Sequence, residues 1–246
     1  MYNYKITTLE NGLKLLSLPN KKFKLTTIDI HLKLGNDSET TTNLLEITHF
    51  LEHLFCLFTS KKYPDGKYIR EYLSNNNIEL DASVVNKHMM FSLEFKKKHT
   101  EFVLDLIINA ILDYIPDEHM FLQEKNAVIE ELNDFIKDSD YNFETKINSI
   151  IFKGHQRAKS IKDRLTNCKK FTSKHIYNFY KTYFTPKNMV ICLFGNFDNN
   201  SITILKKQLS TLKGNSIIYK PMEKQHFNKI IYYNKDSDIS NLKIYF

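Results

Sequence analysis

The sequence of 246 residues has no tryptophan and contains only three cysteines, six glycines and five prolines. The three cysteines are far apart and odd in number, so they predict neither a disulfide framework nor a thiolate metal site. No apolar run is long enough to cross a bilayer, and the first residues lack a signal-peptide pattern. We therefore expect a folded protein of the cytoplasm or another reducing compartment, without a membrane span.

The sequence has an excess of positive charge that is not concentrated in one segment. Lys and Arg number 35 against 28 Asp and Glu, which gives a formal net charge of +7. Such an excess can indicate a nucleic-acid partner. The lysines are scattered, however, and runs such as Lys96-Lys97-Lys98 are not interleaved with aromatic residues. We predict a solvated basic surface and no nucleic-acid partner; steep salt dependence of binding to DNA or RNA would indicate the opposite.

Hydrophobic periodicity predicts a mixture of strands and helices. Strands are expected over residues 4–9, 13–18, 25–34, 78–95 (a pair), 189–194, 230–233 and 242–246. Helices are expected over residues 41–58, 67–75, 100–115, 117–139 and 201–212, and over most of the chain between 139 and 183. Since the elements do not repeat as βαβ units, we predict one α+β domain, residues 1–246, with a mixed, largely antiparallel sheet packed against helices.

The sharpest chemical signal is His49-Phe50-Leu51-Glu52-His53. On a helix, His49 and His53 project from one face, where two imidazoles can bind a single Zn²⁺ ion. Glu52 lies beside that face, and a carboxylate there could take a proton from water activated by the metal. The order H-x-x-E-H is the inverted form of the commoner zinc-peptidase motif. Alternatively, both histidines are ordinary polar residues of an amphipathic helix.

A catalytic zinc ion usually has three protein ligands, so the two histidines need a partner. The expected helix over residues 117–139 carries Glu124, Glu130 and Glu131. Glu124 and Glu131 are seven residues apart and share one helical face, which suits one metal ligand and one supporting carboxylate. An acidic, solvated helix face is the alternative.

With these motifs the chain resembles the pitrilysin and insulin-degrading-enzyme family of inverzincin peptidases. In that family H-x-x-E-H is followed by a helix with two glutamates seven apart, the second of which binds zinc. The resemblance implies one zinc ion per chain, held by His49, His53 and Glu131, with Glu124 as the supporting carboxylate. Glu130 is the alternative third ligand, because the gap between the motifs varies in the family.

Weaker motifs extend the resemblance over nearly the whole chain. Residues 9–15 resemble the L-x-N-G-L opening of the family, 35–39 its G-S-x-x-E segment, and 180–195 its Y-x-P-x-N-M…G element. Two positions depart from the pattern. Asp81-Ala82-Ser83 occupies the substrate-pairing strand where Asn-Ala-x-Thr is usual, and Glu46 stands where a glycine commonly precedes the zinc helix.

The resemblance implies a zinc endopeptidase that binds an extended peptide or small protein beside Ala82, with Glu52 as general base. Family peptidases close two homologous halves like a clamshell, and a second half is not evident here. We therefore expect either a fragment or a subunit that needs a homologous C-terminal half as partner. The alternative within the same fold is a non-catalytic assembly or peptide-binding subunit.

Overall fold

The computed structural model describes residues 4–217. The strands predicted over residues 230–233 and 242–246 lie outside the described residues. No helix within residues 4–217 combines the length and the apolar character needed to cross a membrane.

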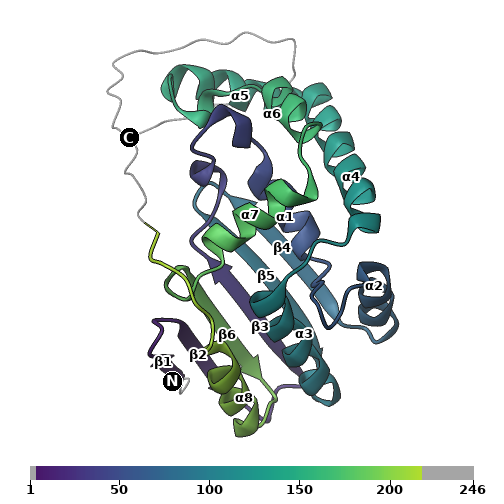
Figure 1. Cartoon of the computed structure of the whole chain (residues 1–246), viewed down its shortest axis with the longest axis vertical. Helices are drawn as coiled ribbons and strands as arrows, with labels where there is room; N and C mark the ends of the chain where they lie inside the picture. Colours follow the sequence, from purple (N-terminus) through teal and green to yellow (C-terminus); the bar gives the residue numbers. More distant parts are fainter. Residues whose placement is uncertain (1–3, 218–246) are drawn as a thin grey trace.

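Within the described residues, one sheet has the strand order β1-β2-β6-β3-β5-β4 (Figure 1). The strands are β1 (Lys5–Thr8), β2 (Lys14–Pro19), β3 (Leu25–Leu32), β4 (Glu79–Val85), β5 (His88–Lys96) and β6 (Met189–Gly195). All neighbours in it are antiparallel except β2 and β6, which run parallel. The predicted α+β class and the mixed, largely antiparallel sheet are confirmed, as is the hairpin around Asn11 and Gly12.

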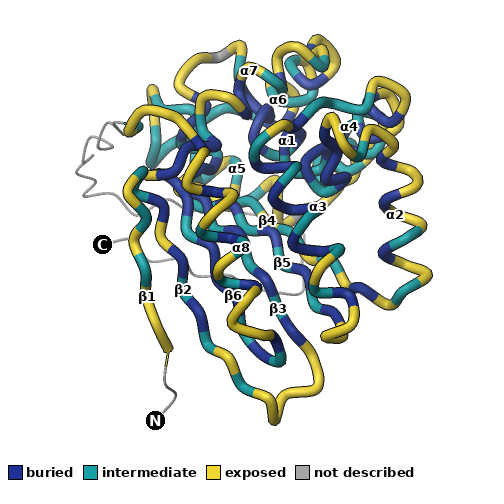
Figure 2. The backbone as a smooth tube through the Cα atoms, turned by 60° about the horizontal axis from the view of Figure 1, so that its bottom comes forward, coloured by how far each residue is buried: buried dark blue, intermediate teal, exposed yellow. Residues whose placement is uncertain are grey.

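Helices pack against one face of this sheet (Figure 1). They are α1 (Ile47–Phe55), α2 (Gly66–Asn75), α3 (Thr100–Asp113), α4 (Glu118–Lys137), α5 (Ser139–Ile151), α6 (Ile161–Cys168), α7 (Ser173–Tyr183) and α8 (Asn199–Leu209). In β3 the side chains of Ile28, Ile30 and Leu32 are buried, whereas those between them are only partly covered. This alternation of period two is the pattern of a sheet with one face in the core (Figure 2).

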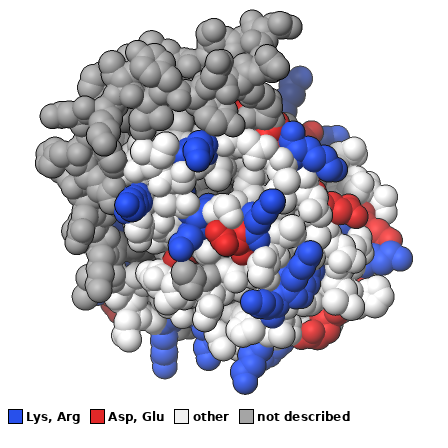
Figure 3. Space-filling view, turned by 90° about the horizontal axis from the view of Figure 1, so that it is seen from above, with Lys and Arg blue, Asp and Glu red and all other residues white. Residues whose placement is uncertain are grey.

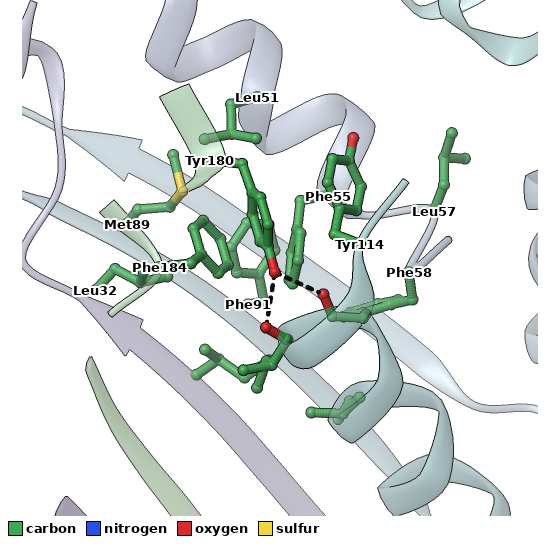
Figure 4. Packing of buried hydrophobic residues seen from close by; sticks show 14 of the residues in the cluster. Leu32, Leu51, Phe55, Leu57, Phe58, Met89, Phe91, Tyr114, Tyr180 and Phe184 are labelled. Carbon is green, nitrogen blue, oxygen red and sulfur yellow. Dashed lines mark hydrogen bonds between the residues drawn. The ribbon is translucent and has the colours of Figure 1, made fainter. Parts of the chain in front are cut away.

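The core beneath the helices is strongly aromatic (Figure 4). Phe55 of α1 packs on Phe91 of β5, with ring centroids 4.8 Å apart, and on Phe184 at 4.5 Å. The hydroxyl of buried Tyr180 donates to the carbonyl oxygen of Ile111 at 2.7 Å, which satisfies its polar end inside the core. These contacts fix α1 against the sheet and against α7.

The helix predicted over residues 41–58 is wrong at both ends. Short 3₁₀ turns occupy Asn36–Ser38 and Thr42–Leu44, and α1 begins only at Ile47 and ends at Phe55. Glu46 has φ 79° and ψ 1°, a left-handed conformation that cannot continue into the preceding residues as right-handed helix. Apolar spacing alone did not reveal this break.

The loop that leads into α1 is held against the turn between β4 and β5. A Cβ atom at Gly35 would lie 1.9 Å from the carbonyl oxygen of Val85, so only glycine permits this approach. The backbone amide of Asp37 donates to the carbonyl of Asn86 at 2.8 Å, and Arg157 forms two hydrogen bonds with the Asp37 carboxylate. The start of α1 is thereby anchored to the sheet.

Helix α4 matches the helix predicted over residues 117–139 within two residues. Asp117 caps its N-terminus, because its side chain accepts hydrogen bonds from the backbone amides of His119 and Met120. Buried Val128 and Leu132 define the inner stripe of α4, which packs against α1 and α6. This contact brings the carboxylates of α4 to the histidines of α1.

Candidate metal centre

His49 and His53 lie one turn apart on α1, with both rings partly buried. Their Nε2 atoms are 3.2 Å apart, and the rings meet edge to face with centroids 4.8 Å apart. Phe50, Leu51 and Leu54 on the opposite side of the helix are completely buried, which fixes the direction in which the imidazoles point. Two nitrogen donors thus converge on one point.

Glu131 of α4 supplies a third donor at the same point. Its carboxylate oxygens lie 3.3 Å from His49 Nε2 and 3.6 Å from His53 Nε2. Within the described residues, these three side chains form a group whose donor atoms all lie within 4.8 Å of one another. Glu130, the alternative from the sequence, is exposed and does not belong to this group.

The donor set fits zinc. Two imidazole nitrogens and one carboxylate oxygen are the ligands of a well-known type of catalytic zinc site, which leaves a coordination position free. The side chain of Glu131 is 45% exposed whereas the two imidazoles are 18% exposed, so the group opens to solvent on the α4 side. Such a site is accessible to a substrate.

A second carboxylate from α4, that of Glu124, lies at the ring nitrogen of His53 opposite the one that faces Glu131. Glu124 Oε2 lies 3.4 Å from His53 Nδ1, and Glu124 Oε1 lies 2.5 Å from a guanidinium nitrogen of Arg70 on α2. Burial raises the pKa of Glu124, but His53 and Arg70 more than offset this and hold it below its ordinary value. The sequence placed Glu124 near the site, whereas Arg70 carried no signal in the sequence.

His49 has its own supporting carboxylate, Glu46, which was noted in the sequence only as a departure from the family pattern. Glu46 Oε1 lies 2.7 Å from His49 Nδ1. Burial lowers the pKa of His49, but hydrogen bonds to Glu131 and Glu46 outweigh it and raise the pKa to about 10. Without metal, the acidic surroundings therefore favour a protonated imidazole at His49.

Glu46 is in turn paired with a cation from a distant element. Arg164 of α6 lies 3.2 Å from Glu46 and 3.1 Å from Glu39, whose side chain is fully buried. Burial would raise the pKa of Glu46, but the contacts with His49 and Arg164 keep it lowered. Arg164 is 118 residues from Glu46 in the sequence, so no local pattern could have indicated this pair.

Glu52 lies between the two histidines in the sequence and is partly buried. Burial raises the pKa of its carboxyl group, with His53 and His49 acting in the opposite direction. A raised pKa brings a carboxylate closer to the range in which it can both accept and return a proton near neutral pH.

The predicted substrate strand, residues 81–83, belongs to β4, which is an outermost strand of the described sheet. Asp81 and Ser83 are exposed and Ala82 is partly buried. Helix α1 packs against β4, so this sheet edge lies close to the histidine helix. An outer strand has backbone groups free to pair with a further strand.

Two surface hollows formed by described residues lie elsewhere. The larger, about 600 Å³, is lined by residues such as Asn11, Pro186 and Thr211. The other, about 340 Å³, is lined by residues that include His31, His88 and Lys187. Neither hollow is lined by His49, His53 or Glu131.

The family model described as insulinase, peptidase family M16, matches residues 16–164, and the model described as peptidase M16 inactive domain matches residues 170–246. The chain belongs to the M16 family of peptidases, which confirms the resemblance inferred from the motifs.

Individual relatives agree with this membership. The chain is 22% identical over 200 residues to an uncharacterized zinc protease, YmxG, of Bacillus subtilis, covering 81% of this chain and 48% of that protein. It is 22% identical over 254 residues to human insulin-degrading enzyme, covering 97% and 24%. A protease from Helicobacter pylori has a similar fold, with a TM-score of 0.76 at 20% identity, over 92% of this chain and 54% of that chain.

The chain thus spans about half the length of these two bacterial proteins and about a quarter of human insulin-degrading enzyme. A probable mitochondrial-processing peptidase β subunit from Arabidopsis thaliana is matched over 84% of this chain but only 38% of its own length, at 21% identity.

Proposed function

We propose that the chain is the zinc-bearing half of a zinc endopeptidase that hydrolyses extended peptides. The observation that carries this proposal is the convergence of His49, His53 and Glu131, from two helices, to within 4.8 Å. Membership of a peptidase family and relatives named as zinc proteases support it. We take Glu131 rather than exposed Glu130 as the third ligand, and one zinc ion per chain as the stoichiometry.

Each side chain of the site has a separate role in the proposed reaction. Bound zinc would supply Lewis acidity, polarising a peptide carbonyl and making water more acidic. Glu52 accepts the proton of the attacking water and later returns it to the leaving amine, which is ordinary general acid–base catalysis. Glu124 and Glu46 hold the two imidazoles in place through their Nδ1 atoms.

The edge strand β4 is the proposed binding surface for substrate. An extended peptide would add to it through main-chain hydrogen bonds, with Asp81, Ala82 and Ser83 alongside. Asp81 is close enough to contribute electrostatically at Glu52. Because Asp81 is acidic, a basic side chain on the substrate would be favoured beside it.

A homologous C-terminal half, on the same polypeptide or a separate subunit, completes the proposed enzyme. The hydrophobic core within residues 4–217 runs from Leu13 to Leu212, which supports a single zinc-bearing domain. The donor group is open to solvent at Glu131, and the chain covers only 48% of the Bacillus subtilis relative and 24% of human insulin-degrading enzyme. A second half would cover the bound peptide and exclude bulk solvent from it.

Neither nucleic acid nor membrane is part of the proposal. On the face drawn in Figure 3, Lys and Arg side chains are dispersed among acidic and uncharged ones rather than gathered in a stripe. Dispersed charge of this kind gives little counterion release on binding to a phosphate backbone.

A non-catalytic, peptide-binding subunit is the competing function. The match to the inactive-domain model covers residues 170–246, whereas every proposed ligand and Glu52 fall within residues 16–164. The complete donor set therefore favours the enzyme.

Cleavage of internally quenched peptides tests the two functions. The chain should be assayed with its homologous half present, as zinc-loaded protein and after chelation. The proposal predicts zinc-dependent cleavage that Glu52→Gln abolishes and that Asp134→Asn, an exposed change on α4, leaves intact. Zinc-loaded wild type that binds peptides without cleaving any of them would favour the non-catalytic subunit.

A further inference from the structure

We propose that Glu46, held by Arg164, is a positioning residue that fixes the imidazole of His49 for metal binding. The inference rests on the proposed function, since it assigns a role toward zinc. It adds a further carboxylate, and a partly buried arginine, to the side chains that determine the properties of the centre.

The contacts form a continuous network from the metal site into the protein interior. His49 Nδ1 lies 2.7 Å from Glu46 Oε1, and the other oxygen, Glu46 Oε2, lies 3.2 Å from Arg164 Nη1. The same nitrogen lies 3.1 Å from Glu39 Oε2, and Glu39 is also bound by the hydroxyl of Thr48 at 2.6 Å. Neither carboxylate, that of Glu46 or that of Glu39, can rotate away without losing one of these contacts.

The side chains that make these contacts are largely shielded from solvent. The side chains of Glu46 and Arg164 are 8% and 14% exposed, and that of Glu39 is 0% exposed. Water cannot readily replace a lost partner there, so a displaced carboxylate or guanidinium would be left unsatisfied. The imidazole of His49 is therefore tied to a rigid anchor rather than to a mobile surface side chain.

The backbone of Glu46 points to the same role. Its φ of 79° lies in the left-handed region, which glycine adopts without cost and glutamate does not. A residue in such a conformation persists where its surroundings over-determine it, often at functional sites. A glycine would suit this backbone, but only glutamate can reach His49 Nδ1. The contact with His49 therefore explains why a glutamate is found at this strained backbone position.

The chemical consequence is a fixed tautomer at His49. A carboxylate at Nδ1 accepts the hydrogen of that nitrogen, so Nε2, which faces Glu131 and His53, is the nitrogen that would give up its proton and offer its lone pair to a metal ion. The arrangement repeats the pairing of His53 with Glu124 and Arg70. The two differ in their cations, since the side chain of Arg70 is 51% exposed and that of Arg164 is 14% exposed. The His49 arm is thus the more rigid of the two.

Glu46→Gly tests the inference most sharply, because glycine relieves the backbone while removing only the carboxylate arm. Zinc affinity should be measured on metal-free protein by competition with a chromophoric chelator. We expect Glu46→Gly to bind zinc about 10- to 100-fold more weakly than wild type, the usual loss for a partner of a metal-bound histidine. Glu46→Gln, whose amide oxygen still accepts from Nδ1, should lose less.

Controls separate positioning from stability. The melting temperature of each metal-free variant should be recorded, and Glu71→Gln, an exposed carboxylate change on α2, should leave zinc affinity unchanged. In ¹H–¹⁵N spectra of the zinc-bound protein, the Nδ1–H proton of wild-type His49 should be protected from exchange with water by its hydrogen bond to Glu46. Loss of that protection in Glu46→Gly, at a melting temperature close to that of wild type, would be specific to positioning.

The outcomes distinguish this inference from the proposed function. Wild-type affinity in both Glu46→Gly and Glu46→Gln would overturn the inference while leaving the zinc site intact. Wild-type protein that binds no zinc would instead overturn the proposed function, and the inference with it. If Glu46→Gly does not fold, Glu46→Asn decides the matter, because asparagine tolerates the left-handed backbone and its side chain is one methylene shorter. Unchanged zinc affinity and an unchanged Nδ1–H signal of His49 in Glu46→Asn would contradict the role.

Discussion

Glu124 and Glu131 lie at opposite nitrogen atoms of one imidazole ring, that of His53. Glu124 is 3.4 Å from Nδ1, and Glu131 is 3.6 Å from Nε2. Their spacing of seven residues puts both carboxylates on the face of α4 that packs against α1. They cannot have the same role, because only the oxygens of Glu131 also reach His49.

Glu131→Gln is expected to release zinc, whereas Glu130→Gln is expected to retain it. Glu131 is the carboxylate within the three-donor group, and Glu130 is exposed on α4. Metal content after dialysis against a weak chelator measures both variants under the same conditions. If Glu131→Gln retains zinc and Glu130→Gln loses it, the third ligand is Glu130, and the family assignment is unchanged.

Glu124→Gln is expected to weaken zinc binding by about 10- to 100-fold without abolishing it, because Glu124 orients His53 but does not belong to the donor group. Arg70→Met should have a smaller effect in the same direction, since Arg70 is half-exposed and acts only through Glu124. Chelator competition gives both values. An affinity loss as large as that of His53→Ala would mean that Glu124 is itself a ligand.

The central part of this arrangement could be predicted from the sequence because it depends on local periodicity. His49 and His53 are one turn apart, and Glu124 and Glu131 are two turns apart, so each helix alone determines which side chains share a face. The fold class followed from the same periodicities. The ends of α1 did not, since they depend on the left-handed Glu46.

The supporting residues could not be predicted, because the contacts that define them join distant elements. Arg164 reaches Glu46 from α6, and Arg70 reaches Glu124 from α2. Neither arginine has a neighbour in the sequence that signals its partner. Only the packing of these helices around α1 brings the charges together.

Glu52→Gln is expected to retain zinc and fold but to lose peptidase activity by about 10²- to 10⁴-fold, the usual contribution of a general base. The amide preserves the shape of the side chain and cannot accept a proton from water. The assay requires the homologous half, and metal content should be measured on the same preparation. Equal cleavage by Glu52→Gln and wild type would exclude Glu52 as the base.

Tyr180→Phe is expected to lower the free energy of unfolding by about 1 to 2 kcal/mol, because the carbonyl of Ile111 loses a buried hydrogen bond. Urea denaturation of metal-free protein measures this change. Zinc affinity should be unaffected, since Tyr180 contacts the core side of α1 through Phe55 and not the histidines. A large loss of zinc binding would show that the core and the metal centre are coupled.

The zinc content of the purified wild-type chain, measured beside His49→Ala and His53→Ala, tests the central claim most directly. Two imidazoles and one carboxylate make a complete three-ligand site, so we predict one equivalent of zinc in the wild type. Either alanine variant should contain almost none while keeping its secondary structure. Wild-type protein prepared without chelators that holds well under one equivalent, or alanine variants that hold as much zinc as wild type, would contradict the account.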